Sequence, residues 1–394
     1  MARVLWLTTQ PPDLTGGGGN IRQAHLLAGV AADHEVHLAV VGHLEDDRLR
    51  ASLARVTELS ASPARPAARG LRRRAEHLRS VVQTEAADCV DQAAARARLA
   101  RVAVEEADVD VVCVEHLALT PLLPARRTAR WVATLHHLPS VQAEQAGAVS
   151  AGPAARWYWR REAGKARRRE RWTAAAYDLT VVCSADDAAR LPPGAAVVPN
   201  GADLDRVPAT PVPETPVLVF VGSLDYRPNV DGARWLCREV LPIVRAARPN
   251  AVIRLVGHQP APAVRELAGP GVEVHGDVPS VDPFLLDARV AVVPLRIGSG
   301  TRLKALEAMA ARRPVVGTAV GLAGLGVTDG VDALVADDAE AFAGAVLDLL
   351  DDDARVARLV AGGRRLVEDR YGWPAIARRY ADLLASSAAT PVRG

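Results

Sequence analysis

The amino-acid sequence predicts an α/β protein with two doubly wound domains, each a parallel sheet between layers of helices. The first observation is length, because 394 residues exceed a single hydrophobic core and suggest two domains of roughly 180 residues each. The second is that short apolar runs ending at glycine or proline turns alternate with helical segments in both halves. The third is the proline-rich run Pro208–Pro216, which separates the two series as a linker.

The first half opens with a buried strand, a glycine-rich loop, a helix and a second strand, which is the start of a parallel sheet. Residues 44–107 are rich in alanine and arginine with weak helical periodicity, and Pro63–Arg74 is predicted to be a loop. The elements predicted for this half are strands at Arg3–Thr9, Glu35–Val41, Val109–Val114, Arg130–Leu135 and Leu179–Cys183, and a helix at Ile21–Ala32.

The second half repeats the order of strand, glycine turn, helix and strand. We place the domain boundary near residue 200, with a linker at 201–215, a second domain at 216–372 and a last helix within 373–386; the tail from Ser386 is predicted to be disordered. The predicted elements are strands at Val217–Val221, Val252–Val256, Val272–Val274, Val290–Val293 and Pro314–Gly317, and helices at Val230–Ala247, Thr301–Ala311, Ala339–Leu350, Arg355–Val367 and Ala375–Leu384.

Composition excludes several classes of protein. A hydrophobic content of 49% with 24% charged residues is typical of a globular protein, and a net charge of +2 gives no reason to expect nucleic acid as a partner. The four cysteines form no C-x-x-C pair, which favours a reduced, cytoplasmic setting. The apolar run that ends at Leu7 is too short for a signal sequence, and the absence of an 18-residue apolar run predicts no transmembrane segment.

The stretch from Ala291 to Thr318 carries the clearest chemical signal. A buried strand is followed by Gly298, Ser299 and Gly300 and then by a helix from Thr301, which predicts free backbone N–H groups at the positive end of a helix dipole, where a phosphate binds. Arg302 and Lys304 fall in the first turn of that helix. Lys165 and Lys304 are the two lysines among 48 basic residues, and a compact ammonium suits a diphosphate oxygen in a tight space. The alternative is an ordinary surface helix start.

The run PLRIGSGTRLKALEAMAARRPVV resembles the donor-binding segment of retaining GT-B glycosyltransferases of family 4. The resemblance implies that Glu307 holds the ribose hydroxyls of a donor nucleotide. Many members have a second glutamate eight residues earlier, where this chain has Ser299, which leaves open what replaces that carboxylate. It also implies the GT-B fold: two Rossmann-like domains that face a cleft between them, with the last helix crossing back to the first domain.

Other segments extend the resemblance. VVPNGADL resembles the signature at which the chain leaves the first domain, and FVGSLDYRPNVDGARWL resembles the first turn of the donor domain. Members often place an arginine and a lysine there on the diphosphate, and here only Arg227 is available, which favours Arg302 and Lys304 as the diphosphate cations. The segment around Gly276 resembles the turn beside the nucleotide base, where the backbone of Val278 would contact the base.

Four consecutive glycines, Gly16 to Gly19, follow the first strand. They are costly for folding, so they predict either a close approach of backbone to ligand or a hinge, while a flexible surface loop is the alternative. The pattern is not G-x-G-x-x-G, which disfavours a dinucleotide site. The resemblance implies that Gly18 and Gly19 face the donor diphosphate and the acceptor.

Histidines follow two predicted strands. His116 follows the strand at Val109–Val114 after one residue, Glu115, and His136 comes directly after the strand at Arg130–Leu135, at the edge of a parallel sheet that opens onto the ligand crevice. The THH segment resembles a family region whose first histidine lies near the donor sugar or the acceptor, which implies a catalytic role for His136 and makes His116 a second candidate. A purely structural role for both is the alternative. The histidines and cysteines show no metal-ligand spacing.

The segment 156–172 combines basic and aromatic residues, with eight basic residues against two acidic ones over Arg156–Arg171. Three interpretations remain open: an amphipathic helix on anionic lipid, a face that holds an acidic or aromatic acceptor, or a solvated helix whose aromatic residues pack onto the sheet. A nucleic-acid interface is disfavoured, because no further basic surface extends the segment.

The resemblance therefore implies a cytoplasmic glycosyltransferase that moves a sugar from a nucleotide-diphosphate donor to a small-molecule, glycan or lipid-linked acceptor, with retention of configuration. We expect no metal and no cofactor, with Arg302 and Lys304 neutralising the leaving diphosphate. A nucleotide-sugar epimerase or hydrolase, and a non-catalytic nucleotide-sugar-binding relative, are the alternatives. The nucleotide, the sugar, the acceptor and the oligomeric state are not predicted.

Overall fold

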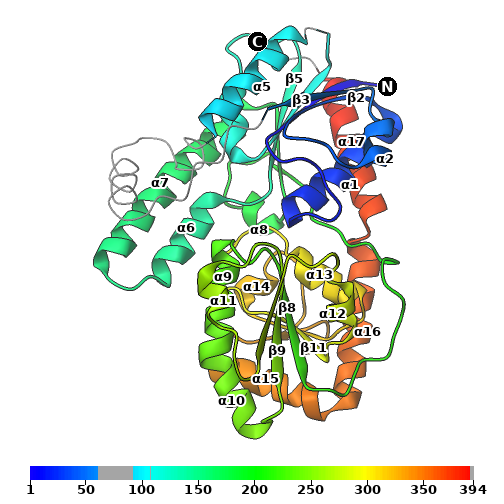
Figure 1. The fold of residues 1–394 in the computed structure, drawn as a ribbon. Helices are drawn as coiled ribbons and strands as arrows, with labels where there is room; N and C mark the ends of the chain where they lie inside the picture. The colour runs from blue at the N-terminus through cyan, green and yellow to red at the C-terminus, as the bar shows by residue number, and fades with distance from the viewer. Residues whose placement is uncertain (61–91, 107, 391–394) are drawn as a thin grey trace. The chain divides into compact units, whose positions relative to one another are not determined.

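The computed structural model describes residues 1–60, 92–106 and 108–390, and these residues form two compact units (Figure 1). The first unit comprises Met1–Pro199 together with Pro374–Gly394, and the second comprises Asn200–Trp373. Each unit contains one sheet whose paired strands all run parallel. The predicted loop Pro63–Arg74 lies outside the described residues.

The first sheet has the strand order β3-β2-β1-β4-β5-β6-β7. Its central strands are buried along nearly their whole length, because helices cover both faces of a parallel sheet and leave no solvated side. The strands are β1 (Arg3–Thr8), β2 (Glu35–Val41), β3 (Arg55–Leu59), β4 (Val111–Glu115), β5 (Arg130–Leu135), β6 (Leu179–Val182) and β7 (Ala196–Val197).

Alternation along β1 builds a core on each face of this sheet. Leu5 and Leu7 join the apolar cluster that includes Leu99 of α5, while Trp6 points to the opposite face and contacts Tyr380 of α17. The helices of the first unit are α1 (Gly18–Asp33), α2 (Asp47–Ser52), α5 (Ala93–Glu105), the 3₁₀ segment η1 (Leu117–Leu122), α6 (Pro139–Ala148), α7 (Pro153–Ala176), α8 (Ala185–Ala188) and α17 (Trp373–Ala388).

The last helix, α17, packs on the first unit. The ring centroids of Tyr380 and Trp6 are 5.8 Å apart, and the Tyr380 hydroxyl forms a 2.8 Å hydrogen bond with Thr134 Oγ1. The prediction of disorder from Ser386 onward is wrong in its first residues, because α17 continues to Ala388 and Ser387 is buried. Ser387 lies three residues beyond the buried Leu384 and so continues the same inward face of the helix.

The second sheet has the order β10-β9-β8-β11-β12-β13. Its strands are β8 (Val217–Val221), β9 (Val252–Gly257), β10 (Val272–Gly276), β11 (Val290–Val293), β12 (Val315–Gly317) and β13 (Leu334–Val335). Its helices are α9 (Arg227–Trp235), the π-helical segment η2 (Leu236–Val240), α10 (Leu241–Ala247), α11 (Pro262–Arg265), α12 (Asp282–Leu286), α13 (Leu303–Ala310), α14 (Ala319–Leu322), α15 (Ala339–Asp351) and α16 (Asp353–Arg370).

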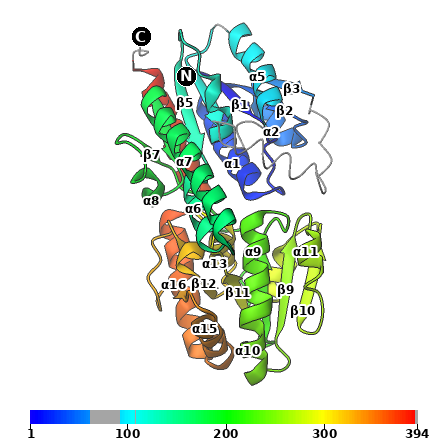
Figure 2. The same cartoon turned by 90° about the vertical axis from the view of Figure 1, so that its left-hand side faces the viewer.

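Helices cover both faces of the second sheet (Figure 2). The segments α9, η2 and α10 follow one another directly and pack with α15, where Trp235 meets Phe342 edge-on at 5.3 Å, while α13 packs with α16. The predicted helix at 230–247 is confirmed, with an earlier start at Arg227 and a π-helical turn just before Pro242, whose nitrogen carries no hydrogen to donate.

Both sheets contain a point at which the strand order reverses. In the first unit the chain moves from β1 outward to β3 and returns at β4, and in the second it moves from β8 outward to β10 and returns at β11. Ligands of doubly wound sheets bind beyond the carboxyl ends of the strands at such a point. The candidate residues are therefore those that follow β1 and β4, and those that follow β8 and β11.

Candidate functional site

The loop after β11 leads directly into α13. Gly300 has φ = 78°, a left-handed conformation that glycine adopts without strain. The predicted helix start at Thr301 is two residues early, because α13 begins at Leu303 and Arg302 is its N-cap with an extended backbone. Lys304 is thus the second residue of the helix, close to its positive end.

Thr301 joins this loop to the first residue of the second unit. The Asn200 backbone N–H donates to Thr301 Oγ1 at 2.8 Å, and Asn200 Nδ2 donates to the Thr301 carbonyl at 2.9 Å. Both residues are buried, so each bond satisfies a group that water does not reach. The two segments that resemble family motifs, around Asn200 and around Thr301, are therefore in direct contact.

Lys304 extends across the sheet toward the residues that follow β8. Its ammonium donates to Asn229 Oδ1 at 2.7 Å and lies 4.1 Å from the centroid of the Phe220 ring. Gly222 leaves room for it, since a Cβ there would lie 2.7 Å from Nζ. Burial, with a smaller effect of the neighbouring Arg302, lowers the pKa of Lys304 to about 7.

Asn229 was not predicted as a site residue. Its side-chain orientation is set by a 2.8 Å bond from Nδ2 to the Ser223 carbonyl, which leaves Oδ1 to accept from Lys304. The signal that could have found Asn229 is the R-P-N sequence at the start of α9. Proline is favoured in the first turn of a helix, and the first turn of a helix that follows a strand lies near the carboxyl end of that strand.

Arg302 turns back onto its own loop. Its guanidinium donates to the carbonyls of Ser299, Gly300 at 2.7 Å and Val320 at 3.1 Å, and the side chain is buried. These bonds hold the loop in its shape. The predicted contact of Arg302 with a diphosphate stays a prediction, as do those of the Ser299, Gly300 and Thr301 backbone.

Glu307 lies one turn beyond Lys304 on α13 and is half-buried. Its Oε1 accepts from Arg206 Nη1 at 2.9 Å, and Arg206 Nη2 contacts Asp282 Oδ1 at 2.8 Å, so one guanidinium joins two carboxylates. Burial raises the pKa of Glu307, and Arg206 opposes that rise. The carboxylate is thus neither enclosed in apolar side chains nor free of a cation.

Two further predicted donor residues lie at the same edge of the second sheet. Arg227 is the exposed first residue of α9, two positions before Asn229. Val278 follows β10 and is half-buried next to Asp277, which has φ = 55° and accepts a 2.7 Å bond from the Gln259 backbone on Oδ1. The sheet therefore brings Arg227, Val278, Lys304 and Glu307 to the carboxyl ends of its strands, and their contacts with a donor stay predictions.

The first unit holds a second polar cluster, at the ends of β4 and β5. Glu115 Oε2 and His136 Nε2 are 2.5 Å apart, and the rings of His136 and His116 lie 4.0 Å apart between centroids. Gln23 Nε2 is 3.5 Å from His116 Nε2. Burial raises the pKa of Glu115 to about 7 and lowers the pKa of both histidines well below the usual value.

The predicted glycine loop is shorter than expected. Gly18 and Gly19 are the first two residues of α1, with Gly17 as N-cap, rather than loop residues before a helix at Ile21. Glycine is a poor helix former, so propensity alone places the helix start too late. A Cβ on Gly19 would lie 3.3 Å from His136 Nδ1, which puts the start of α1 directly beside the histidine pair.

The basic segment 156–172 lies within α7, which packs along α6. Charged side chains on its inward face have hydrogen-bond partners. Lys165 Nζ donates to Glu162 at 2.5 Å, and Ser140 donates from its backbone and its hydroxyl to Glu170 at 2.8 and 2.5 Å. Trp157 and Trp172 stay 54% and 41% exposed, so these two aromatic side chains are not packed onto the sheet.

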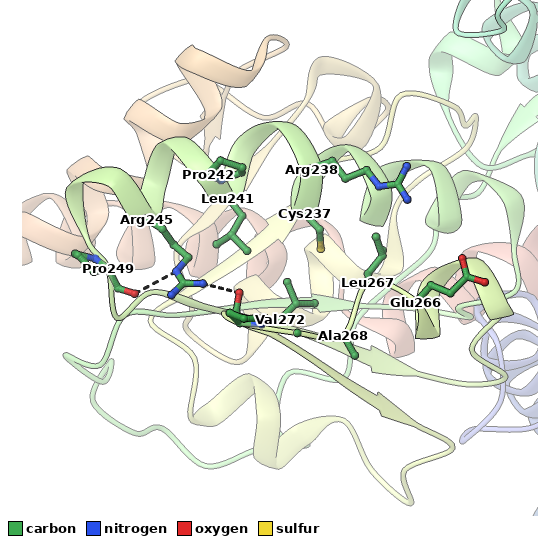
Figure 3. A pocket seen from close by; sticks show the side chains of 12 residues that line it. Cys237, Arg238, Leu241, Pro242, Arg245, Pro249, Glu266, Leu267, Ala268 and Val272 are labelled. Carbon is green, nitrogen blue, oxygen red and sulfur yellow. Dashed lines mark hydrogen bonds between the residues drawn. The ribbon is translucent and has the colours of Figure 1, made fainter.

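A pocket of about 580 Å³ lies elsewhere on the second unit (Figure 3). It is formed by residues of η2 and α10 together with the segment that leads into β10. Val272, at its wall, is the first residue of β10, so the pocket lies at the amino ends of the strands and away from the predicted donor residues. We do not assign it to the candidate site.

Two general features concern metals and membranes. Within residues 1–60, 92–106 and 108–390, no cluster of three or more His, Cys, Asp or Glu side chains is arranged to hold a metal ion. Across the same residues, each helix is too short or too polar to traverse a lipid bilayer.

Comparison with known proteins places the donor-side residues in a family. Residues 215–352 match the model of the family described as glycosyl transferases group 1. Residues 215–352 therefore form a domain that matches the group 1 glycosyltransferases. The matched range includes Asn229, Lys304 and Glu307, and the family resemblance predicted from the sequence is confirmed.

Two curated relatives are named as a glycosyltransferase and a mannosyltransferase. D-inositol 3-phosphate glycosyltransferase of Xylanimonas cellulosilytica is 32% identical over 219 residues, which cover 48% of this chain and 51% of the relative. A GDP-mannose-dependent monoacylated α-(1-6)-phosphatidylinositol monomannoside mannosyltransferase of Corynebacterium glutamicum is 29% identical over 211 residues, covering 48% and 55%. The chain thus spans about half the length of the curated relatives it matches.

Solved structures share the fold over nearly the whole chain. Sucrose-phosphate synthase of Thermosynechococcus elongatus is 20% identical with a TM-score of 0.70, over 98% of both chains. HepE of Anabaena, solved with UDP and glucose, is 13% identical with a TM-score of 0.66, over 98% of this chain and 100% of HepE. These likenesses and the two parallel sheets confirm the predicted GT-B fold class.

Proposed function

We propose that this protein moves a sugar from a nucleotide-diphosphate donor to an acceptor hydroxyl and binds the donor on its second unit. The observation that carries the proposal is Lys304, a half-buried residue in the first turn of α13 whose amine has the neutral amide of Asn229 as its hydrogen-bond partner. A cation near a helix N-terminus is unfavourable unless an anion compensates it. A diphosphate beside the loop at Gly298–Thr301 supplies that anion.

In the proposed reaction the bond from the anomeric carbon to the diphosphate breaks while the acceptor oxygen bonds to that carbon. Negative charge grows on the leaving diphosphate, so an ammonium and backbone N–H groups fixed beside it stabilise the transition state more than the bound donor. Lys304 is the main cation, Glu307 accepts from the ribose hydroxyls, and His136 contacts the sugar or the acceptor. We propose retention of configuration by same-face attack, with a diphosphate oxygen taking the acceptor proton, and no metal.

The names of the relatives suggest the substrate classes to test. HepE binds UDP and UDP-glucose, while the corynebacterial relative uses GDP-mannose and a phosphatidylinositol-linked acceptor. A thermal-shift panel of UDP, GDP, ADP and dTDP sugars tests the donor, and a transfer assay in EDTA tests the metal-free scheme. Stabilisation by one nucleotide class and full activity in EDTA are expected. Failure of the whole panel, or a strict metal requirement, would contradict the proposal.

A second candidate is motivated by Ser299, which stands where many relatives carry a glutamate. Without that carboxylate, the chain could turn over the donor as an epimerase or hydrolase, or bind it without catalysis. Consumption of donor with no acceptor present would favour the epimerase or hydrolase. Binding in the thermal-shift panel with no turnover under any acceptor would favour the binding protein.

We also propose that α7 contacts an anionic, cytoplasm-facing membrane surface, where a lipid-linked acceptor would reside. Arginines at 160, 161, 167, 168 and 171 are exposed on α7, as are Trp157 and Trp172 toward its two ends. Such a face binds anionic headgroups, with indole rings at the interface. Co-sedimentation with vesicles of phosphatidylglycerol and phosphatidylcholine, but not of phosphatidylcholine alone, is expected; binding to neither would remove this contact.

A further inference from the structure

Two adjacent strand ends of the first unit bring a carboxylate and an imidazole together away from solvent. Glu115 is the last residue of β4, and His136 follows the last residue of β5; the register pairs Glu115 with Thr134. The side chain of Glu115 is fully buried and that of His136 is 7% exposed. Oε2 lies 2.5 Å from Nε2, within hydrogen-bond distance, and an ionised acceptor strengthens such a bond.

A neutral imidazole carries one proton, and the partner of one ring nitrogen decides which nitrogen holds it. Burial and Arg22 lower the pKa of His136, so its ring is neutral above pH 7. An ionised Glu115 can only accept, so the ring proton lies on Nε2. The other nitrogen, Nδ1, is then an acceptor with a free lone pair.

The surroundings of Nδ1 indicate that a ligand completes this group. Nδ1 of His136 and Oε1 of Gln23 are both shielded from solvent, and neither has a hydrogen-bond partner among the residues that the structure describes. Leaving a buried acceptor unpaired is unfavourable. Gly19 carries no side chain beside this atom, and a Cβ there would lie 3.3 Å from Nδ1.

We propose that Glu115 is a positioning residue that keeps the ring proton of His136 on Nε2, so that Nδ1 accepts a hydrogen bond from a hydroxyl group of the substrate beside Gly19. A hydroxyl donor fits this group of acceptors, whereas a phosphate, which has only acceptor oxygens, does not. The substrate part of the inference rests on the proposed function. The protonation of His136 does not, and it is measured separately.

The proposal holds at pH values where Glu115 is ionised. Burial raises the pKa of Glu115 to about 7, while His116, Arg22 and a hydrogen bond from Thr134 oppose that rise. Below that pH a protonated Glu115 would itself donate to Nε2 and reverse the arrangement, so the measurement belongs near pH 8. The titratable groups that face the pair come from four elements, and they are Arg22 of α1, Cys113 and His116 at β4, His137 after β5 and Tyr380 of α17.

The direct test is nuclear magnetic resonance of the full chain labelled with ¹⁵N-histidine at pH 8. The His136 signals are assigned by their loss in His136→Asn. We expect the wild-type ring to show a protonated Nε2 and an unprotonated Nδ1. A wild-type ring protonated on Nδ1 would overturn the proposal, whether or not any substrate is yet known.

Glu115→Gln is the decisive variant, because it keeps the shape and replaces one oxygen by an amide donor. Arg22 lies near the carboxylate as a positive charge, which favours an orientation with the new amide oxygen toward Arg22 and the new amide nitrogen toward His136. The ring proton should move to Nδ1, and kcat/KM with the donor found in the nucleotide panel should fall by at least about 10²-fold. A variant that keeps both the wild-type ring protonation and the wild-type kcat/KM would contradict the proposal.

Glu170→Gln is the matched control. Glu170 is also a buried carboxylate of the first unit, but its partner is Ser140 on α6. We expect this variant to leave the His136 signals and kcat/KM unchanged. If it changed them as Glu115→Gln does, the effect would come from the loss of any buried carboxylate, and the specific role of Glu115 would be excluded.

Discussion

The ammonium of Lys304 donates a 2.7 Å hydrogen bond to Oδ1 of Asn229, although the two residues are 75 positions apart in the chain. The contact links the start of α13 to the start of α9 across the point where the strand order of the second sheet reverses. An amide oxygen orients the ammonium without neutralising it. Lys304 therefore keeps its affinity for an anion, and this property leads to the first two predictions.

The affinity for the nucleoside diphosphate that the nucleotide panel selects should fall as pH rises above about 7.5. Burial lowers the pKa of Lys304 to about 7, so at higher pH the free protein carries a neutral amine and binding of the diphosphate requires proton uptake. The limiting slope is about tenfold in Kd for each pH unit. Calorimetric titration between pH 7.5 and 9.5 measures it. Lys304→Arg, charged throughout, should give a flat profile, and a flat profile in the wild type would contradict the prediction.

Lys304→Met should stabilise the fold while abolishing most of the activity. The unfolded chain keeps Lys304 protonated up to its ordinary pKa of 10.5 and the folded chain only to about 7, so the wild-type free energy of unfolding rises with pH between these values. At pH 6 the variant should be more stable by up to about 4 kcal/mol. Urea unfolding at pH 6 and pH 10 should show this difference shrinking, and kcat should fall about 10²–10³-fold. A variant less stable at pH 6 would refute the burial argument.

Glu307→Gln should raise the KM for the nucleotide sugar and change kcat less. A ribose hydrogen bond is present before and during transfer, so its loss weakens ground-state and transition-state binding alike. Arg206→Lys is the companion variant, because a lysine keeps the charge but cannot join Glu307 and Asp282 with one planar group. We expect a smaller rise in KM for it. An unchanged KM in Glu307→Gln would remove the ribose contact.

Thr301→Val should destabilise the second unit by about 1–3 kcal/mol. The substitution keeps the shape but removes Oγ1, which leaves the buried backbone N–H of Asn200 without its acceptor. Thr301→Ser retains the oxygen and should unfold close to the wild type. Denaturant unfolding compares the three proteins, and equal stability of the valine and serine variants would show that the bond between Asn200 and Thr301 contributes nothing.

The strands were predictable because their residues are determined locally. Runs such as Val217–Val221 and Val290–Val293 are wholly apolar, end at glycine or proline, and have the same bounds in the structure. The ends of helices were less predictable where glycine or a terminal tail was involved, as at Gly18 and Ser387. There, packing against neighbouring elements outweighs local preference.

The partners of the site residues were not predictable from sequence. His136 and Glu307 were named in advance, but Glu115 and Arg206, which bind them, were not. Glu115 meets His136 only because β4 and β5 pair in one register, and Arg206 reaches Glu307 over 101 positions. Such contacts depend on how distant elements pack, a property for which a single sequence has no local signal.

The scarcity of lysine has a practical consequence for labelling. Lys165 is 1% exposed and held by Glu162, whereas Lys304 is half-buried and, with its pKa near 7, is largely an uncharged nucleophile at mild alkalinity. Among lysine side chains, an amine-directed reagent such as pyridoxal phosphate with borohydride should therefore modify Lys304 selectively. Mass spectrometry of the resulting peptide, with and without a nucleotide present, would then show whether a bound nucleotide protects the Lys304 amine from modification.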